Sequence, residues 1–131
     1  MKKGIFLLLF TLITISINAQ KSYWKLKFNN GTYYLALFKS HAKFGPHIRT
    51  YFTGDDRATL YAVKYYPSSR KYKVQTKNGW SNKNYLYIGQ NGKLKFIRTK
   101  GTIELKRINR SDIPSYIRNN TYYPRKYIRD Y

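Results

Sequence analysis

The side chains in this sequence with the most evident binding chemistry are basic and aromatic. The 131 residues include 26 Lys and Arg, only 5 Asp and Glu, and 15 Tyr, and the formal net charge is +21 at pH 7. Basic groups interleaved with flat aromatic rings can neutralise an anionic polymer and stack on it. The composition therefore predicts an anionic polymer or membrane surface as partner, with nucleic acid, lipopolysaccharide and acidic polysaccharide all left open.

Two groups of residues are the candidates for contacting that partner. Lysines that alternate with apolar residues should point outward from strands, and Trp80 should lie among them. Arg49 and Tyr51 share a side of another segment and form either a small binding patch or an ordinary solvated surface, and we favour the second interpretation. The complete candidate set is Lys25, Lys27, Arg49, Tyr51, Lys71, Lys73, Lys77, Trp80, Lys93 and Lys95.

The lysines have a second interpretation, in which they serve solubility and keep strand edges from pairing with other chains. A surface that is merely soluble carries both signs of charge, whereas this chain has almost no acids. The charge imbalance therefore favours binding.

No residue pattern favours catalysis or metal binding. The chain has no cysteine, and His41 and His47 flank a short loop that contains no further metal-ligating residue. Asp55 and Asp56 are adjacent in a turn-forming sequence, Gly54-Asp55-Asp56, where neighbouring side chains point apart instead of facing each other as a catalytic pair. No serine sits in a Gly-x-Ser-x-Gly motif, and no glycine-rich phosphate loop is present. We expect a protein that is not an enzyme and that uses no metal or other cofactor.

Residues 1–19 have the pattern of a secretory signal peptide. A basic start is followed by an apolar run from Ile5 to Ile17 and by Ala19, a small residue suited to cleavage. The run is shorter than the roughly 20 apolar residues that span a bilayer as a helix. We expect a secreted or periplasmic protein, cleaved near Ala19, with no transmembrane span. Loss of Lys2 and Lys3 would leave 24 basic and 5 acidic side chains, a net charge of +19 on 112 residues.

The remaining chain predicts an all-β fold in one domain, residues 20–118, with a basic Tyr/Arg-rich tail at 119–131. Short alternating segments are separated by turn-forming residues, and the connections are too short for parallel crossovers. The expected product is an antiparallel up-and-down meander of about seven or eight strands, closed as a small barrel or folded as a sandwich. The expected strands are Ser22–Phe28, Thr32–Lys39, His47–Thr53, Ala58–Tyr66, Arg70–Lys77, Asn84–Gly89, Lys93–Thr99 and Thr102–Ile108.

Alternation also predicts which side chains form the core. Trp24, Leu26 and Phe28 should face inward in the first strand, and Tyr72, Val74 and Thr76 in the fifth.

Asn91-Gly92 favours a two-residue type I′ hairpin turn. That turn would pair Tyr87 with Phe96 and would place Tyr85, Tyr87, Leu94 and Phe96 together on the core face.

After Ile108, Ser111 or Asp112 followed by Pro114 is typical of a helix start, so we expect one short C-terminal helix ending near Arg118. The tail beyond it should be either mobile or docked by its tyrosines.

Two further functions stay open beside polyanion binding. One is a small-ligand carrier, with an aromatic-lined barrel cavity whose wall would include Trp24, Phe28, Tyr72 and Phe96. The other is a structural or interaction protein of the cell envelope that uses its Tyr/Arg tail as the contact.

Overall fold

The computed structural model describes residues 21–118 and 125–129. The predicted signal peptide lies outside the described residues, as do residues 119–124 and 130–131 of the predicted tail.

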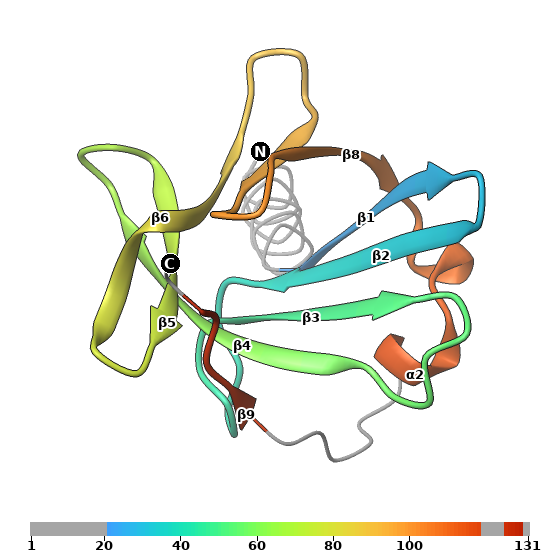
Figure 1. The fold of residues 1–131 in the computed structure, drawn as a ribbon, viewed down its shortest axis with the longest axis horizontal. Helices are drawn as coiled ribbons and strands as arrows, with labels where there is room; N and C mark the ends of the chain where they lie inside the picture. Colours follow the sequence, from blue (N-terminus) through green and yellow to red (C-terminus); the bar gives the residue numbers. More distant parts are fainter. Residues whose placement is uncertain (1–20, 119–124, 130–131) are drawn as a thin grey trace, which may run out of the picture.

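Eight antiparallel strands close into a barrel (Figure 1). Each strand pairs with the next along the chain, and pairing of the first with the eighth closes the ring. The all-β antiparallel meander expected from the sequence is confirmed, and it forms a barrel and not a sandwich. The strands are β1 (Lys21–Phe28), β2 (Gly31–Phe38), β3 (His47–Phe52), β4 (Thr59–Tyr66), β5 (Lys71–Thr76), β6 (Gly79–Ile88), β7 (Leu94–Ile97) and β8 (Ile103–Ile108).

The barrel interior is filled by one apolar cluster to which every strand contributes. Trp24 is 1% exposed, and its indole Nε1 donates a hydrogen bond of 2.9 Å to the Ser22 hydroxyl. The expected inward faces of β1 and β5 are confirmed in the main, although Phe28 at the end of β1 is 41% exposed. The buried members of this cluster are Trp24, Leu35, Leu37, Ile48, Val63, Tyr72, Val74, Leu86, Leu94, Phe96 and Leu105.

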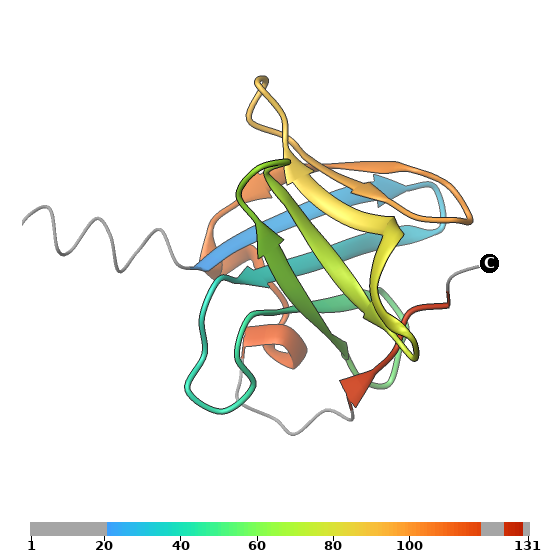
Figure 2. The same ribbon diagram turned by 90° about the vertical axis from the view of Figure 1, so that its left-hand side faces the viewer.

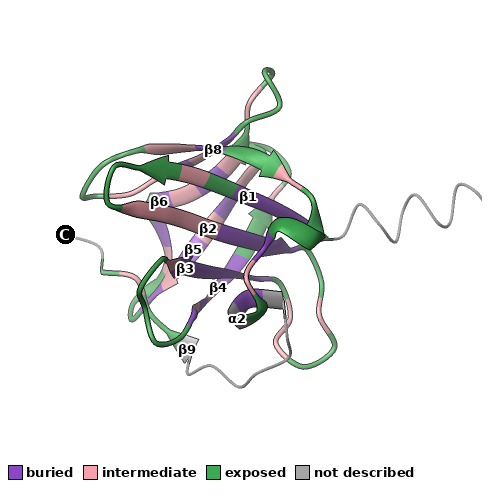
Figure 3. Ribbon diagram, turned by 90° about the vertical axis from the view of Figure 1, so that its right-hand side faces the viewer, coloured by how far each residue is buried: buried purple, intermediate pink, exposed green. Residues whose placement is uncertain are grey.

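A second apolar cluster lies on the outside of the barrel, over β2, β3 and β4. Its cover is the segment after β8, which forms a 3₁₀ turn, η1 (Arg110–Asp112), and one α-helical turn, α2 (Ser115–Arg118). Ile113 and Ile117 from this segment are buried against Tyr51 and Leu60. Figure 3 shows α2 seated on buried parts of the strands. Because of this cover, β3 is buried on both faces.

The C-terminal segment departs in detail from the single capped helix that the sequence suggests. The 3₁₀ turn is preceded by Asn109, which makes no side-chain capping bond, and Ile113 is extended. The helical turn begins only after Pro114. The covering contact is made by the two isoleucines and not by a regular helix face.

The predicted register between β6 and β7 is wrong by one residue. Backbone bonds join Gly92 N to Gly89 O (3.0 Å) and Gly89 N to Lys93 O (2.9 Å), and Gly92 has φ +77°. These bonds describe a three-residue loop with a positive-φ residue at its end, not a two-residue turn. The pairing therefore shifts by one residue and Leu86, not Tyr87, lies opposite Phe96. A one-residue shift moves a strand's side chains to the other face, so Tyr85 and Tyr87 point outward.

Residues 79–83, which lie between the expected strands Arg70–Lys77 and Asn84–Gly89, are part of β6 and not of a loop. Thr76 pairs with Gly79 and Gln75 with Trp80, but Lys73 pairs with Tyr85, so β6 carries extra residues against β5. The Ser81 hydroxyl accepts backbone N–H bonds from Lys83 and Asn84 (3.0 and 2.8 Å) within this bulge. Bulges of this kind bend a strand and redirect its side chains.

The described part of the tail closes a seam in the barrel. Along β4, Thr59–Ala62 pair with β3 and Val63–Tyr66 pair with β5. A short strand, β9 (Arg125–Lys126), pairs in parallel with Leu60 and Tyr61 of β4. Ile128 N then donates to Gln75 O of β5 (3.0 Å), and the Ile128 side chain packs against the interior cluster. Figure 2 shows this segment beside the β5–β6 side of the barrel.

This part of the tail is held by backbone pairing and Ile128, whereas Tyr127 is 47% exposed. Among the described residues, no helix is both long enough and apolar enough to cross a bilayer.

Replacing the buried indole of Trp24 should remove a large part of the free energy of unfolding. Trp24→Ala is expected to lower the free energy of unfolding by about 3–5 kcal/mol, because it removes a fully buried indole and leaves a cavity. Phe28→Ala on the same strand is the matched control, and at an exposed position it should cost about 1 kcal/mol. Urea denaturation of both variants measures the difference. Equal losses would mean that Trp24 does not anchor the interior.

Candidate anion-binding surfaces

Lysines and tyrosines cover the outer face of β4–β7. Cross-strand pairing places Tyr66 beside Lys71, Lys73 beside Tyr85, and Tyr87 beside Lys95. We call this surface the Lys–Tyr face and define it as Lys64, Tyr66, Lys71, Lys73, Tyr85, Tyr87 and Lys95.

Several ammonium groups of the Lys–Tyr face lie over its rings. The Nζ of Lys71 is 4.2 Å from the Tyr85 ring centroid, and that of Lys73 is 4.5 Å from Tyr66. Lys95 Nζ is 5.9 Å from Tyr87, whose ring is stacked 6.3 Å from that of Tyr85. Each such contact contributes about 0.5–1 kcal/mol at an exposed site. These contacts orient both the ammonium groups and the ring planes.

The same face contains a pairing that does not help the fold. Lys64 and Lys73 occupy directly opposed positions of β4 and β5. Lys25 of β1 and Lys106 of β8 are opposed in the same way on another part of the barrel. Like charges directly opposite one another destabilise a sheet. An anion at the surface would relieve that repulsion.

One acid borders the Lys–Tyr face. Glu104 of β8 pairs with Lys95 in the ladder, and its carboxylate lies 3.5 Å from the Lys93 Nζ. Both side chains of this ion pair are substantially exposed, and exposed pairs contribute little to stability. Lys93 is thereby placed at the β8 edge of the surface.

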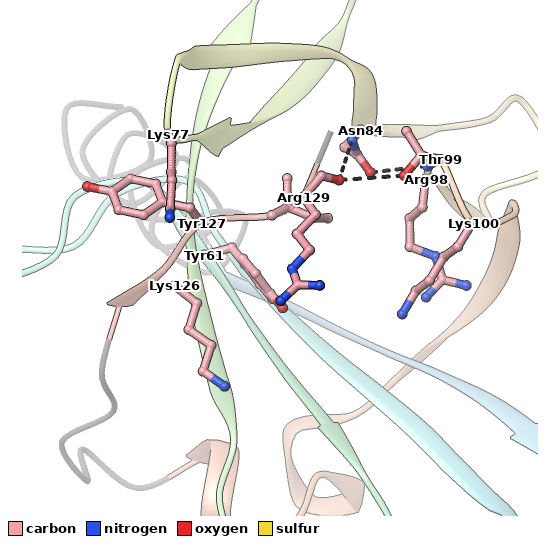
Figure 4. Close-up of a pocket in the computed structure, with 10 residues that line it drawn as sticks. Tyr61, Lys77, Asn84, Arg98, Thr99, Lys100, Lys126, Tyr127 and Arg129 are labelled. Carbon is pink, nitrogen blue, oxygen red and sulfur yellow. Dashed lines mark hydrogen bonds between the residues drawn. The ribbon is translucent and has the colours of Figure 1, made fainter. Parts of the chain in front are cut away.

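A second basic site lies where the tail meets the barrel, and we call it the tail pocket (Figure 4). It is a cavity of about 460 Å³, and none of the ten described residues that line it is acidic. Tyr61, Tyr127, Asn84, Thr99 and Ile128 form half of the lining. The other half is basic: Lys77, Arg98, Lys100, Lys126 and Arg129.

The tail pocket is assembled around Asn84, which is 1% exposed. Its Oδ1 accepts a bond from Thr99 N (3.2 Å), and its Nδ2 donates to Ser81 Oγ (3.1 Å) and Arg129 O (3.5 Å). The Thr99 hydroxyl also donates to Arg129 O (3.5 Å). One buried amide thus connects the β6 bulge, the turn after β7 and the tail.

The turn after β7 fixes a further cation of this pocket. Arg98 Nε donates to Gly101 O (3.1 Å), and its guanidinium carbon lies 5.6 Å from the Phe96 ring centroid. Figure 4 shows Arg98 and Lys100 on one side of the pocket, Lys77 and Tyr127 on the other, and Arg129 between them. Lys126 also borders a neighbouring depression that contains Asp55 and Asp56.

Two tyrosine hydroxyls beside this site stay protonated at neutral pH. Burial raises the pKa of Tyr61, and the nearby positive charge of Arg98 only partly opposes this. Burial likewise raises the pKa of Tyr33, against the opposing effects of its hydrogen bond with Thr50 and of Arg98. Tyr61, which lines the pocket, is therefore a neutral hydrogen-bond donor there, whereas the Tyr33 hydroxyl is engaged with Thr50.

The predicted site residues are distributed over several parts of the barrel. Lys71, Lys73 and Lys95 come together on the Lys–Tyr face, and Lys77 lines the tail pocket. Lys25 and Lys27 are exposed on β1, in a different sector of the barrel. Trp80 is half-buried at the start of β6, beside Gln75.

Arg49 and Tyr51 are not on a solvated surface, which corrects both interpretations of that patch. Arg49 is 1% exposed and Tyr51 is 9% exposed, because the C-terminal segment covers this side of β3. Arg49 Nε donates to His47 Nε2 (3.1 Å), and its Nη1 donates to Ile117 O (3.0 Å). Its guanidinium carbon lies 4.4 Å from the Phe38 ring centroid. This buried cation fastens α2 to the barrel.

The two histidines belong to the same structural cluster. His41 Nδ1 accepts backbone N–H bonds from Lys43 and Phe44 (both 3.1 Å). The His47 ring is stacked on Phe38 at 4.5 Å, and its Nδ1 lies 2.8 Å from Gly45 O. These contacts order the loop between β2 and β3.

The sequence analysis missed most of the aromatic and pocket residues. Tyr85 and Tyr87 were assigned to the core because the hairpin register was wrong by one residue. The lysine alternation on β5 predicted that strand's share of the Lys–Tyr face. No local pattern links Arg98 and Lys100 to Arg129, since only the tertiary bonds of Asn84 bring them together.

The known proteins offer no assignment: no family model, curated protein or solved structure matches this chain.

The histidine cluster predicts a pH dependence of stability. Burial, with help from the charges of Arg49, Lys21 and Lys43, lowers the pKa of His41 from 6.5. The unfolded chain then takes up this proton more readily, so stability present above pH 6.5 is lost as the pH falls toward the folded-state pKa. His41→Asn keeps an oxygen acceptor for the loop amides but cannot titrate.

Thermal melts between about pH 8 and about pH 5 measure this effect. The wild-type Tm should fall more steeply than that of His41→Asn. Parallel curves for the two proteins would show that His41 does not contribute to the pH dependence.

Proposed function

We propose that this protein is a secreted or periplasmic, non-enzymatic binding domain for an anionic polymer or an anionic envelope surface, and that the Lys–Tyr face is its contact. The observation that carries the proposal is the alternation of ammonium groups and rings across four adjacent strands. Secretion is proposed from the pattern of residues 1–19.

The dimensions of the face favour a repeating ligand. Four neighbouring strands spaced about 4.8 Å apart extend over roughly 14 Å. Charges on that scale can contact several successive anionic groups of one chain. Flat rings held between the ammonium groups add a stacking surface that tolerates different sequences or sugars.

The orientation of the rings supports a role in binding beyond solubility. Tyr85 and Tyr87 lie on the outside of the barrel, where both are half-buried among lysine side chains. A surface selected for solubility alone has no need of aromatic rings.

The two alternative functions receive less support from the fold. Trp24, Tyr72 and Phe96, three of the four rings expected on a carrier's cavity wall, pack within the interior cluster. Residues 125–129 of the tail are engaged with β4 and β5, which leaves less of the tail for an external partner.

Neutralising the Lys–Tyr face should weaken polyanion binding. Lys71→Gln/Lys73→Gln is expected to reduce the salt slope of single-stranded oligonucleotide binding by about 1.4, since each neutralised phosphate contributes about 0.7 for single strands. The matched control is Lys25→Gln/Lys27→Gln, which removes the same charge from β1. Titrations at several salt concentrations measure both slopes, and anionic phospholipid vesicles and dextran sulfate replace the oligonucleotide in parallel series.

Equal weakening in the two double variants would indicate attraction by net charge alone and would contradict a contact at this face. The absence of wild-type binding to all three polyanions at low salt would overturn the proposed function itself.

A further inference from the structure

We infer that the tail pocket binds a small phosphate monoester, with the doubly charged phosphoryl group held among its basic side chains. This site is separate from the Lys–Tyr face, and the inference does not depend on polymer binding there.

The positive charge of the tail pocket favours a doubly charged anion. Five basic side chains from three separate parts of the chain line a cavity of about 460 Å³, and none of the ten described lining residues is acidic. Bringing cations together costs electrostatic free energy, and a cavity with low-dielectric walls concentrates their field. A dianion offsets that cost better than a single negative charge does.

The identity of the basic groups favours a phosphoryl group. Arg98 and Arg129 carry planar guanidinium groups that match the paired oxygens of phosphate, and lysines add mobile point charges. Arg98 is already oriented by its bond to Gly101 O, so less freedom is lost when it contacts a ligand. Carboxylates share the two-oxygen geometry but carry one charge, which is a poor match for this many cations.

The tyrosines favour an ester over the free ion. Tyr61 is part of the lining and its hydroxyl is protonated at neutral pH, so it can donate to a phosphoryl or sugar oxygen. Tyr127 also lines the pocket, on the Lys77 side, and as a residue it is 47% exposed, so its ring provides a flat surface for a cyclic substituent. The volume falls within the range of about 300–1,000 Å³ typical of small-molecule sites.

Because the tail pocket is built from two parts of the chain, ligand binding there should also change the thermal stability. Its walls come partly from the barrel and partly from residues 126–129, which are joined through Asn84 and Thr99. A ligand that touches both parts holds the tail against β4 and β5. Binding should therefore raise the Tm, since a ligand specific for the folded state stabilises it by mass action.

The test is calorimetric titration at about 150 mM salt, where exposed charges are screened beyond about 8 Å. The probes are glucose 6-phosphate, inorganic phosphate, glucose 6-sulfate, glucuronate and glucose. Glucose 6-phosphate should bind most tightly and raise the Tm, and glucose should show no heat of binding.

Lys77→Gln/Lys100→Gln is the pocket variant, and both positions are exposed, so the fold should be retained. It should weaken glucose 6-phosphate binding by at least about tenfold, the value of one hydrogen bond to a charged group. The matched control is Lys71→Gln/Lys73→Gln, with the same change in charge, and it should leave that affinity within about twofold of wild type. A thermal melt of each variant without ligand checks folding.

Each contrary result overturns the inference. Failure of glucose 6-phosphate to bind the folded wild type would remove the site, and equal weakening by both double variants would reduce it to attraction by net charge. Binding of glucuronate or of inorganic phosphate as tightly as the phosphate ester would contradict the assigned ligand class. Loss of oligonucleotide binding in the pocket variant alone would make the pocket part of the polymer site and would likewise overturn the inference. The expected result is loss of oligonucleotide binding in the Lys71/Lys73 variant alone, which would show that the two sites are independent.

Discussion

The excess of positive charge is the constraint on which the rest of this structure depends. A formal charge of +21 on 131 residues leaves little scope for stabilising ion pairs. Lys93 and Glu104 form a salt bridge at an exposed position, where such pairs contribute little. Stability has to come from the closed ring of backbone hydrogen bonds and from two apolar clusters, one inside the barrel and one beneath the C-terminal segment.

Aromatic rings take over part of the role that acids have in a mixed-charge protein. Lys71 and Lys73 lie over tyrosine rings, and Arg49 lies over Phe38 in the buried cluster. A ring face attracts a cation without cancelling its charge. The lysines of the outer face are thus held in place while they keep their full attraction for anions, which an ion pair with Asp or Glu would reduce.

The strands could be predicted from the sequence more fully than the candidate sites could. Alternation over Trp24, Leu26 and the lysines of β5 depends only on local geometry, so strand positions and lysine orientation could be inferred from sequence. The β6–β7 register depends on whether Asn91-Gly92 closes a two- or three-residue loop, and one bond from Gly92 N to Gly89 O decides it. The burial of Arg49 depends on Ile113 and Ile117, more than sixty residues away in the chain, and no local pattern reveals that contact.

The division of β4 explains why the barrel has a second basic site at all. Its first half pairs with β3 and its second half with β5, so the two neighbours separate along one strand and leave backbone groups of Leu60 and Tyr61 to be paired. Residues 125 and 126 pair with these backbone groups, and the Ile128 side chain packs against the interior cluster.

This backbone pairing also fixes the main chain of a basic segment beside the turn after β7. The side chains of Lys126 and Arg129 then line the space between this segment and that turn. Pairing of these backbone groups stabilises the seam, because buried unpaired amide groups are costly. The tail pocket is in this sense a consequence of closing the barrel, since the backbone pairing of the tail brings its basic residues beside those of the turn after β7.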